Sequence, residues 1–268
     1  MTPPPYALLE RHTRDVAKAG EILLNAVGRI AFDCTALDPA AFEEFTLALK
    51  ANCYLQDFGK ANSHFHEMLY NSGFIQLIRH EALSGLLFTR EPLRKWFAQL
   101  PVRETLQLAA LWGAMGHHRK FHRDSRPESQ MPAANVFVSH DDFKSMLKSM
   151  KEDLGFECDP PPFKHDFIVT ESEDGQYKIA ADAALWDLQE KFDECQKLFA
   201  AEEDRRMLAL IKGFGIAADV AASTIAKPDG QRGDYALSVP INKLTELRLT
   251  SDDLQKLIIK RAWDSVDI

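Results

Sequence analysis

Apolar residues recur at every third or fourth position along most of the chain, which is the period of an amphipathic helix. The pattern predicts helices over residues 6–32, 42–57, 74–88, 104–115, 141–154 and 251–263, and a helix in two pieces over 179–226. Shorter helices or turns are expected over residues 62–70 and after Pro92. Asp38-Pro39 marks a helix start, and the run from Lys227 to Gly230 marks a stop.

Two stretches break the helical pattern. Residues 123–134 are polar and contain prolines, so we expect a loop there. Residues 158–177 contain three consecutive prolines and the run Phe167-Ile168-Val169, which is compatible with a short strand or with irregular chain. Neither stretch is a strong linker. The pattern therefore predicts one all-α domain with long loops, extending over residues 1–268.

The apolar face of the helix expected over residues 42–57 ends on a carboxylate. Phe42, Phe45, Leu49 and Cys53 are spaced by three or four residues, and Asp57 continues the same face. An unpaired buried carboxylate is unfavourable and becomes protonated unless a partner stabilises its charge. Asp57 therefore needs a partner.

Histidines and a second carboxylate lie in or beside the apolar segments, where Lys and Arg are rare. The candidates, in chain order, are His12, Asp57, His80, His117, His118 and Asp219. Carboxylate and imidazole form the ligand set of zinc, manganese, iron and similar ions. The sequence therefore predicts a metal centre around Asp57. Four other histidines are expected at the surface: His64, His66, His140 and His165.

Composition narrows the class of protein. The formal net charge of −8 is unlike that of a general nucleic-acid coat protein, although metal ions can supply positive charge locally in a nuclease. Four cysteines without a CxxC pair argue against a zinc ribbon and a disulfide scaffold. No apolar run approaches the roughly 18 residues that span a bilayer, and residues 1–5 lack the features of a signal peptide. We expect a cytoplasmic protein with no membrane contact.

Five short motifs contain the candidate ligands. They are LLERHTRDVA at residues 8–17, QDFGKA at 56–61, RHEALS at 79–84, GHH at 116–118 and ADVAAS at 218–223. In this order they resemble the motifs of HD-type metal phosphohydrolases, and most closely those of the HD nuclease domain of the CRISPR-associated helicase-nuclease of type I systems. Each motif alone is unspecific, but five in the same order make the resemblance specific.

The resemblance implies a single HD-domain helical bundle around two divalent ions bridged by Asp57. One position would use His12, Gln56, Asp57 and Asp219, and the other would use Asp57, His80, His117 and His118. The expected cofactors are one or two ions of manganese, iron, cobalt, nickel or magnesium. Asp57 would act in catalysis through both ions, and Lys60 would steady a phosphate.

The resemblance also implies a function and partners. It predicts a metal-dependent endo- or exonuclease that cleaves single-stranded DNA in CRISPR interference, together with a helicase subunit or domain and a crRNA-guided surveillance complex. The chain contains no Gly-x-x-x-x-Gly-Lys-Ser/Thr helicase motif. Residues 226–268 are interpreted as an extension toward such a helicase.

One position departs from the family, which has histidine where this chain has Gln56. An amide oxygen is a poorer ligand than imidazole for borderline metals, so reduced nuclease activity is expected. Two other functions stay open: an HD phosphohydrolase acting on nucleotides or small phosphoesters, and an inactive HD domain kept for docking to the helicase or surveillance complex. Taken singly, His12 and His80 are also compatible with core histidines, and Asp57 with a helix cap.

Overall fold

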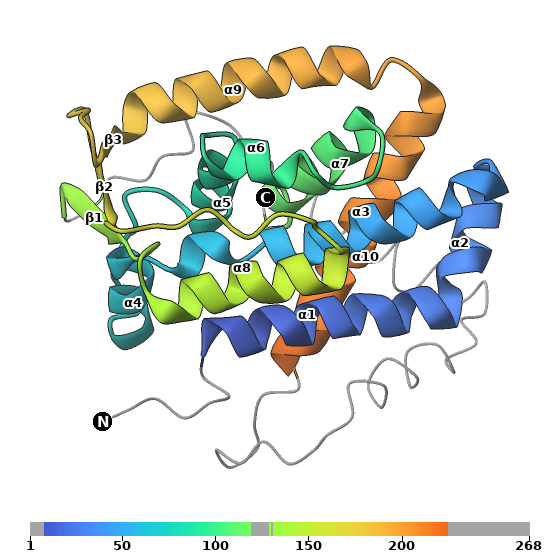
Figure 1. Ribbon diagram of the computed structural model, residues 1–268, viewed down its shortest axis with the longest axis horizontal. Coiled ribbons are helices and arrows are strands. Elements are labelled where there is room, and N and C mark those ends of the chain that lie inside the picture. The colour runs from blue at the N-terminus through green and yellow to red at the C-terminus, as the bar shows by residue number, and fades with distance from the viewer. Residues whose placement is uncertain (1–7, 119–128, 130, 225–268) are drawn as a thin grey trace, which may run out of the picture.

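The computed structural model describes residues 8–118, 129 and 131–224, and this part of the chain is predominantly helical (Figure 1). The helices are α1 (Leu9–Leu23), α2 (Arg29–Cys34), α3 (Phe42–Leu55), α4 (Ser63–Tyr70), α5 (His80–Phe88), α6 (Leu93–Phe97), α7 (Glu104–Met115), α8 (Asp141–Leu154), α9 (Ala181–Leu198) and α10 (Glu202–Thr224). The predicted all-α class is confirmed.

Helix α3 is the centre of the bundle and contacts α1, α7, α8 and α10. Its second half is buried on every side, since Ala48, Leu49 and all residues of 51–55 are inaccessible to solvent. A helix that is apolar all round has no face for water and is therefore surrounded by other helices. In Figure 1, α10 crosses the molecule from the end of α9 to α1.

A glycine on α1 allows three helices to meet closely. A Cβ atom at Gly20 would lie 2.8 Å from the sulfur of Cys53 on α3 and 3.8 Å from the Cβ of Ala218 on α10. A larger residue would push these helices apart. The close approach places the first turns of α1 and the last turns of α10 beside the end of α3.

The chain after α3 is fixed against α5 by a second glycine, in the short 3-10 turn Phe58–Lys60. A Cβ at Gly59 would lie 1.9 Å from the carbonyl oxygen of His80, so no other residue fits without backbone movement. The Gly59 N–H donates to the Ser84 hydroxyl at 2.7 Å, and this hydroxyl donates to the Gln56 carbonyl at 3.2 Å. These contacts hold Asp57 next to His80.

A small sheet covers one end of the bundle. Strand β1 (Ala133–Val136) pairs antiparallel with β2 (Phe167–Thr170), which pairs parallel with β3 (Lys178–Ala180). The strand considered for Phe167-Ile168-Val169 is therefore present. Strand β1 begins inside the segment that was expected to be a loop over residues 123–134, most of which lies outside the described residues.

The helix expected over residues 74–88 begins later, at His80. Phe74, Leu77 and Ile78 are buried as a helical face would be, but their segment is not helical. The Leu77 N–H donates to Nδ1 of His64 at 3.0 Å instead of to a helical carbonyl. Buried irregular chain can therefore mimic helical periodicity over a few residues.

His64 is buried, so the expectation that it lies at the surface was wrong. Its ring links two segments, because Nε2 also contacts the Ala133 carbonyl at 2.8 Å. His66, His140 and His165 are exposed, as expected.

The other predicted helices correspond to α1 to α4 and α6 to α10, with a π-helical turn at Leu24–Gly28. The helix predicted over residues 251–263 and the interpreted extension over 226–268 lie outside the described residues. No helix in the described ranges is long and apolar enough to cross a membrane.

Candidate metal centre

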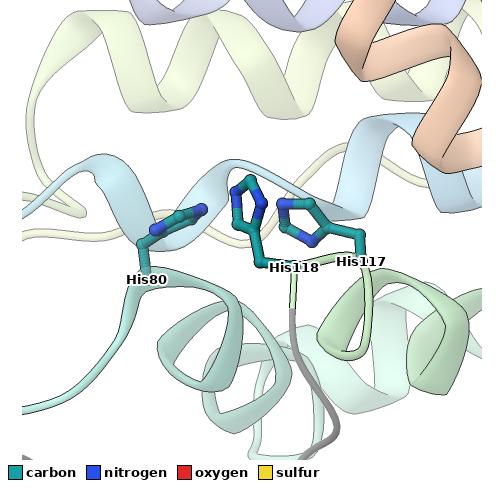
Figure 2. Close-up of side chains that lie close together, drawn as sticks. All are labelled: His80, His117 and His118. Carbon is teal, nitrogen blue, oxygen red and sulfur yellow. The ribbon is translucent and has the colours of Figure 1, made fainter. Parts of the chain in front are cut away.

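Three imidazole rings converge from two elements, as Figure 2 shows for His80, His117 and His118. One ligand nitrogen from each lies within 4.8 Å of the others. His80 is the first residue of α5, while His117 and His118 follow Gly116, the residue that caps the end of α7. Consecutive residues inside a helix point about 100° apart. Because these two lie beyond the helix end, their rings can share one space, with centroids 4.0 Å apart.

A second group combines one imidazole with two carboxylates from three separate helical regions. His12 Nε2 lies 2.8 Å from Asp57 Oδ2 and 3.6 Å from Asp219 Oδ1. His12 comes from α1, Asp219 from α10, and Asp57 from the turn after α3. The ligand atoms of these three residues also lie within 4.8 Å of one another.

Asp57 lies between the two groups. Its Oδ2 faces His12, while its Oδ1 lies 3.9 Å from Nε2 of His80. The carboxylate is 1% exposed, so the expected burial of Asp57 is confirmed. One carboxylate thus presents one oxygen to each group.

The candidate ligand atoms are buried, and apart from ion-pair contacts of His12, His80, Asp57, Asp219 and Lys60 with one another, they have no hydrogen-bond partner in the described part of the chain. They are His12 Nε2, Gln56 Oε1, both carboxylate oxygens of Asp57, His80 Nε2, His117 Nε2 and Asp219 Oδ1. Buried polar atoms are normally hydrogen-bonded. Their convergence here is what a set of metal ligands would show, and imidazole with carboxylate suits divalent transition ions. The residues present therefore fit a metal centre.

The remaining ring nitrogens are oriented by neighbours. His117 Nδ1 contacts the Ala114 carbonyl at 2.5 Å, which leaves Nε2 for a ligand. His80 Nδ1 lies 3.4 Å from the Glu81 carboxylate, which is itself paired with Arg79. Metal-binding histidines almost always have such a partner on the second nitrogen. Glu81 was not among the predicted site residues, although it lies within the RHEALS motif.

Protonation states also suit a metal centre. Burial alone would raise the pKa of Asp57, but Lys60 and His12 hold it well below its usual value. Asp219 likewise has a lowered pKa, because a hydrogen bond from His12 outweighs its burial. Burial lowers the pKa of His80 to about 4. Two ionised carboxylates and a neutral imidazole are the forms that bind metals.

The pKa of His12 is shifted in the opposite direction from that of His80. Burial lowers its pKa, but hydrogen bonding to Asp219 and Asp57 outweighs this and raises the value to about 9. Without a cation between the carboxylates, His12 thus carries a proton at neutral pH. A proton and a metal ion compete for the same nitrogen.

Lys60 contacts Asp57 instead of facing open solvent. Its ammonium lies 2.8 Å from Asp57 Oδ1 and its side chain is only 15% exposed. Asp57 therefore has a cationic partner three residues further along the chain, which the scarcity of Lys and Arg in the apolar segments did not suggest. The predicted contact of Lys60 with a phosphate is not tested by this arrangement.

Gln56, which precedes Asp57, is fully buried. It caps the end of α3, and its Nε2 donates to Asn52 Oδ1 at 3.1 Å. Asn52 was not predicted as a site residue. The signal that could have identified Asn52 is its position: it lies one helical turn before Gln56, on a helix segment without solvent access.

Comparison with known proteins gives one informative relative. The chain is 31% identical over 240 residues to a Myxococcus xanthus (strain DK1622) protein that carries the assigned name CRISPR-associated nuclease/helicase Cas3. The alignment covers 87% of this chain but 31% of the relative, so the chain spans about a third of that protein's length. No family model matches the chain. No solved structure matches it either.

Proposed function

We propose that this chain is the HD-type nuclease part of a CRISPR-associated nuclease/helicase and hydrolyses phosphodiester bonds of single-stranded DNA with divalent ions. The relative's name and the five ordered motifs support the family and the chemistry. The single observation that carries the proposal is the position of Asp57, whose two oxygens face two separate groups of buried ligand atoms.

Each residue has a defined part in this proposal. His80, His117 and His118 would hold one ion, and His12 and Asp219 the other. Asp57 would contribute one carboxylate oxygen to each. When bound, two neighbouring divalent ions activate a water and stabilise the attacking and leaving oxygens of a phosphodiester. Glu81 keeps the ring of His80 in its orientation.

Lys60 and protonated His12 are both cationic partners of Asp57 in this structure. With the carboxylate bound to a metal ion, the ammonium of Lys60 would be free to contact a substrate phosphate. Lys is a common phosphate binder, acting as a point charge.

The proposed partners follow from the length of the relative and from the net charge of the chain. The relative is about three times longer than the chain, and its name includes a helicase. A helicase subunit or domain would supply single-stranded DNA, with a crRNA-guided surveillance complex choosing the target. The net charge of −8 gives the chain little general attraction for DNA phosphates, so delivery by such partners in the cytoplasm suits it.

The test uses circular single-stranded DNA, the matching duplex and a panel of nucleotides, each with manganese, cobalt, nickel or magnesium. Cleavage of the single-stranded circle by the wild type, absent in Asp57→Ala and retained in the exposed control Asp33→Ala, would support the proposal. Hydrolysis of nucleotides alone would instead favour an HD phosphohydrolase. Ion binding without any hydrolysis would favour a docking domain.

A further inference from the structure

We infer that the two halves of the centre select different classes of ion, with Gln56 supplying a carbonyl oxygen to the His12–Asp57–Asp219 group. That group would take a hard ion such as Mn²⁺ or Mg²⁺, and the three-histidine group a borderline ion such as Co²⁺, Ni²⁺ or Fe²⁺. This inference rests on the metal centre of the proposed function and adds the chemical class of each ion.

The orientation of the Gln56 amide follows from its neighbours. Asn52 Nδ2 donates to the Ala110 carbonyl at 2.9 Å, a contact that only the NH₂ end of the amide can make. The Asn52 oxygen therefore faces Gln56 and requires a donor, which is Gln56 Nε2 at 3.1 Å. Gln56 Oε1 is thus the end directed away from Asn52.

Packing prevents this pair from rearranging. A Cβ at Gly215 of α10 would lie 1.9 Å from Asn52 Oδ1 and 2.7 Å from Gln56 Nε2. The two amides therefore fill the space that a side chain at Gly215 would occupy. Gly215 lies one helical turn before Asp219, so the amide pair and that ligand share one stretch of α10.

The free oxygen has no donor to satisfy it in the described part of the chain. Gln56 Oε1 is buried without a hydrogen-bond partner. The nearby acidic side chains, those of Asp57 and Asp219, are carboxylates, which offer acceptor oxygens and no donor in their ionised form. A buried carbonyl oxygen without a donor is unfavourable by itself. A cation shared with the carboxylates of Asp57 and Asp219 would satisfy all three groups at once.

The donor sets of the two groups then differ in kind. The His80 group offers three imidazole nitrogens and one oxygen of Asp57. The His12 group offers a single imidazole and the carboxylate oxygens of Asp57 and Asp219. Our inference adds the amide oxygen of Gln56, which is buried without a hydrogen-bond partner in the described part of the chain. Imidazole favours borderline transition ions, whereas carboxylate and carbonyl oxygens favour manganese and magnesium. The three-histidine group should fill first with cobalt or nickel.

Metal binding to the purified chain tests this without using nuclease activity. Cobalt is followed by its visible absorption, manganese by electron paramagnetic resonance, and both by calorimetry after removal of bound ions. The wild type should bind one Co²⁺ tightly and then one Mn²⁺ that does not displace it. Gln56→Met, which keeps the length and removes the oxygen, should weaken Mn²⁺ binding by about 10-fold or more and leave the first Co²⁺ unchanged.

Gln56→His should have the opposite effect, raising Co²⁺ bound from about one to about two ions per chain. Gln76→Met is the matched control. Gln76 Oε1 is also buried without a hydrogen-bond partner among the described residues, and its Nε2 contacts the sulfur of Met68, away from the centre. This control should bind both ions as the wild type does.

The outcomes separate the two proposals. Unchanged Mn²⁺ affinity in Gln56→Met, with the first Co²⁺ retained as evidence of folding, overturns the inference. Unchanged Co²⁺ stoichiometry in Gln56→His overturns it too. A wild type that binds neither ion overturns the metal centre itself, and with it the proposed function.

Discussion

The two ligand groups share Asp57 but differ in charge when no metal is bound. The His80 group consists of imidazoles, and burial lowers the pKa values of His80 and His118. The His12 group consists of two ionised carboxylates around an imidazole that holds a proton, with a pKa of about 9. One half is arranged around nitrogen lone pairs, and the other around negative charge that the proton on His12 partly neutralises; Lys60 contacts the Asp57 oxygen that faces His80.

This difference shows how a buried centre stays folded without its ions. Isolated buried carboxylates would be strongly unfavourable, but a protonated histidine and a lysine stabilise them. Neutral imidazoles need no such partner. An ion in the His12 half would therefore displace the proton on His12, while an ion that uses Asp57 Oδ1 in the His80 half would displace the ammonium of Lys60.

The largest effect on metal binding and DNA cleavage is expected at Asp57, which lies between the two ligand groups. Asp57→Ala removes the residue proposed to touch both ions, so both should be lost together with DNA cleavage. The loss of cleavage should exceed the about 10–100-fold typical of residues that only orient a ligand. Elemental analysis and cleavage of single-stranded DNA provide the measurements. Wild-type metal content and cleavage in this variant would show that the groups do not form one centre.

A substitution in one ligand group should remove the ion of that group and leave the other ion bound. His117→Ala should lose the ion of the histidine group and keep the other, while Asp219→Ala should do the reverse. Each variant would then bind about one ion per chain, and cleavage would fall by at least about 10-fold. His66→Ala, at an exposed histidine, serves as the control. Loss of both ions from either variant would contradict the independence of the groups.

The stability of the metal-free chain should depend on pH through one histidine in each ligand group, His12 and His80. The folded pKa of His12, about 9, exceeds its unfolded value of 6.5, so its contribution is present below pH 6.5 and is lost between pH 6.5 and 9. The folded pKa of His80, about 4, lies below 6.5, so stability also falls as pH decreases from 6.5 toward 4. The contribution of His12 is at most about 3 kcal/mol.

Urea unfolding in the presence of a chelator, from pH 4 to 9.5, would measure this dependence. Stability should be greatest near pH 6.5. His12→Gln should flatten the alkaline side and leave the acidic side in place. A wild-type profile that is flat between pH 6.5 and 9 would show that His12 is not stabilised by its carboxylates.

The smallest effect is expected at Lys60. Lys60→Met removes the ammonium that competes with ions for Asp57, so ion affinity should rise modestly. The same change should raise the KM for single-stranded DNA if Lys60 also contacts a phosphate. Lys18→Met, at an exposed ion pair on α1, is the control. Weaker ion binding in Lys60→Met would contradict the competition.

Much of this arrangement was accessible from the sequence because its causes are local. Helical periodicity predicted α3, α7 and α8 closely, since each has a clear apolar pattern and recognisable ends. The motifs selected His12, Asp57, His80, His117, His118 and Asp219, and the structure brings these six into two adjacent groups. The chemistry of imidazole and carboxylate was sufficient to suggest a metal centre.

Other features depended on contacts between distant segments, and only the tertiary structure decided them. The late start of α5 and the burial of His64 follow from a hydrogen bond across 13 residues, which periodicity does not detect. The division of the two Asp57 oxygens between the groups requires α1, α5 and α10 to be in place. The direction of the Gln56 carbonyl depends on Ala110 and Gly215, because an amide has two chemically different ends and only its neighbours decide which end is free.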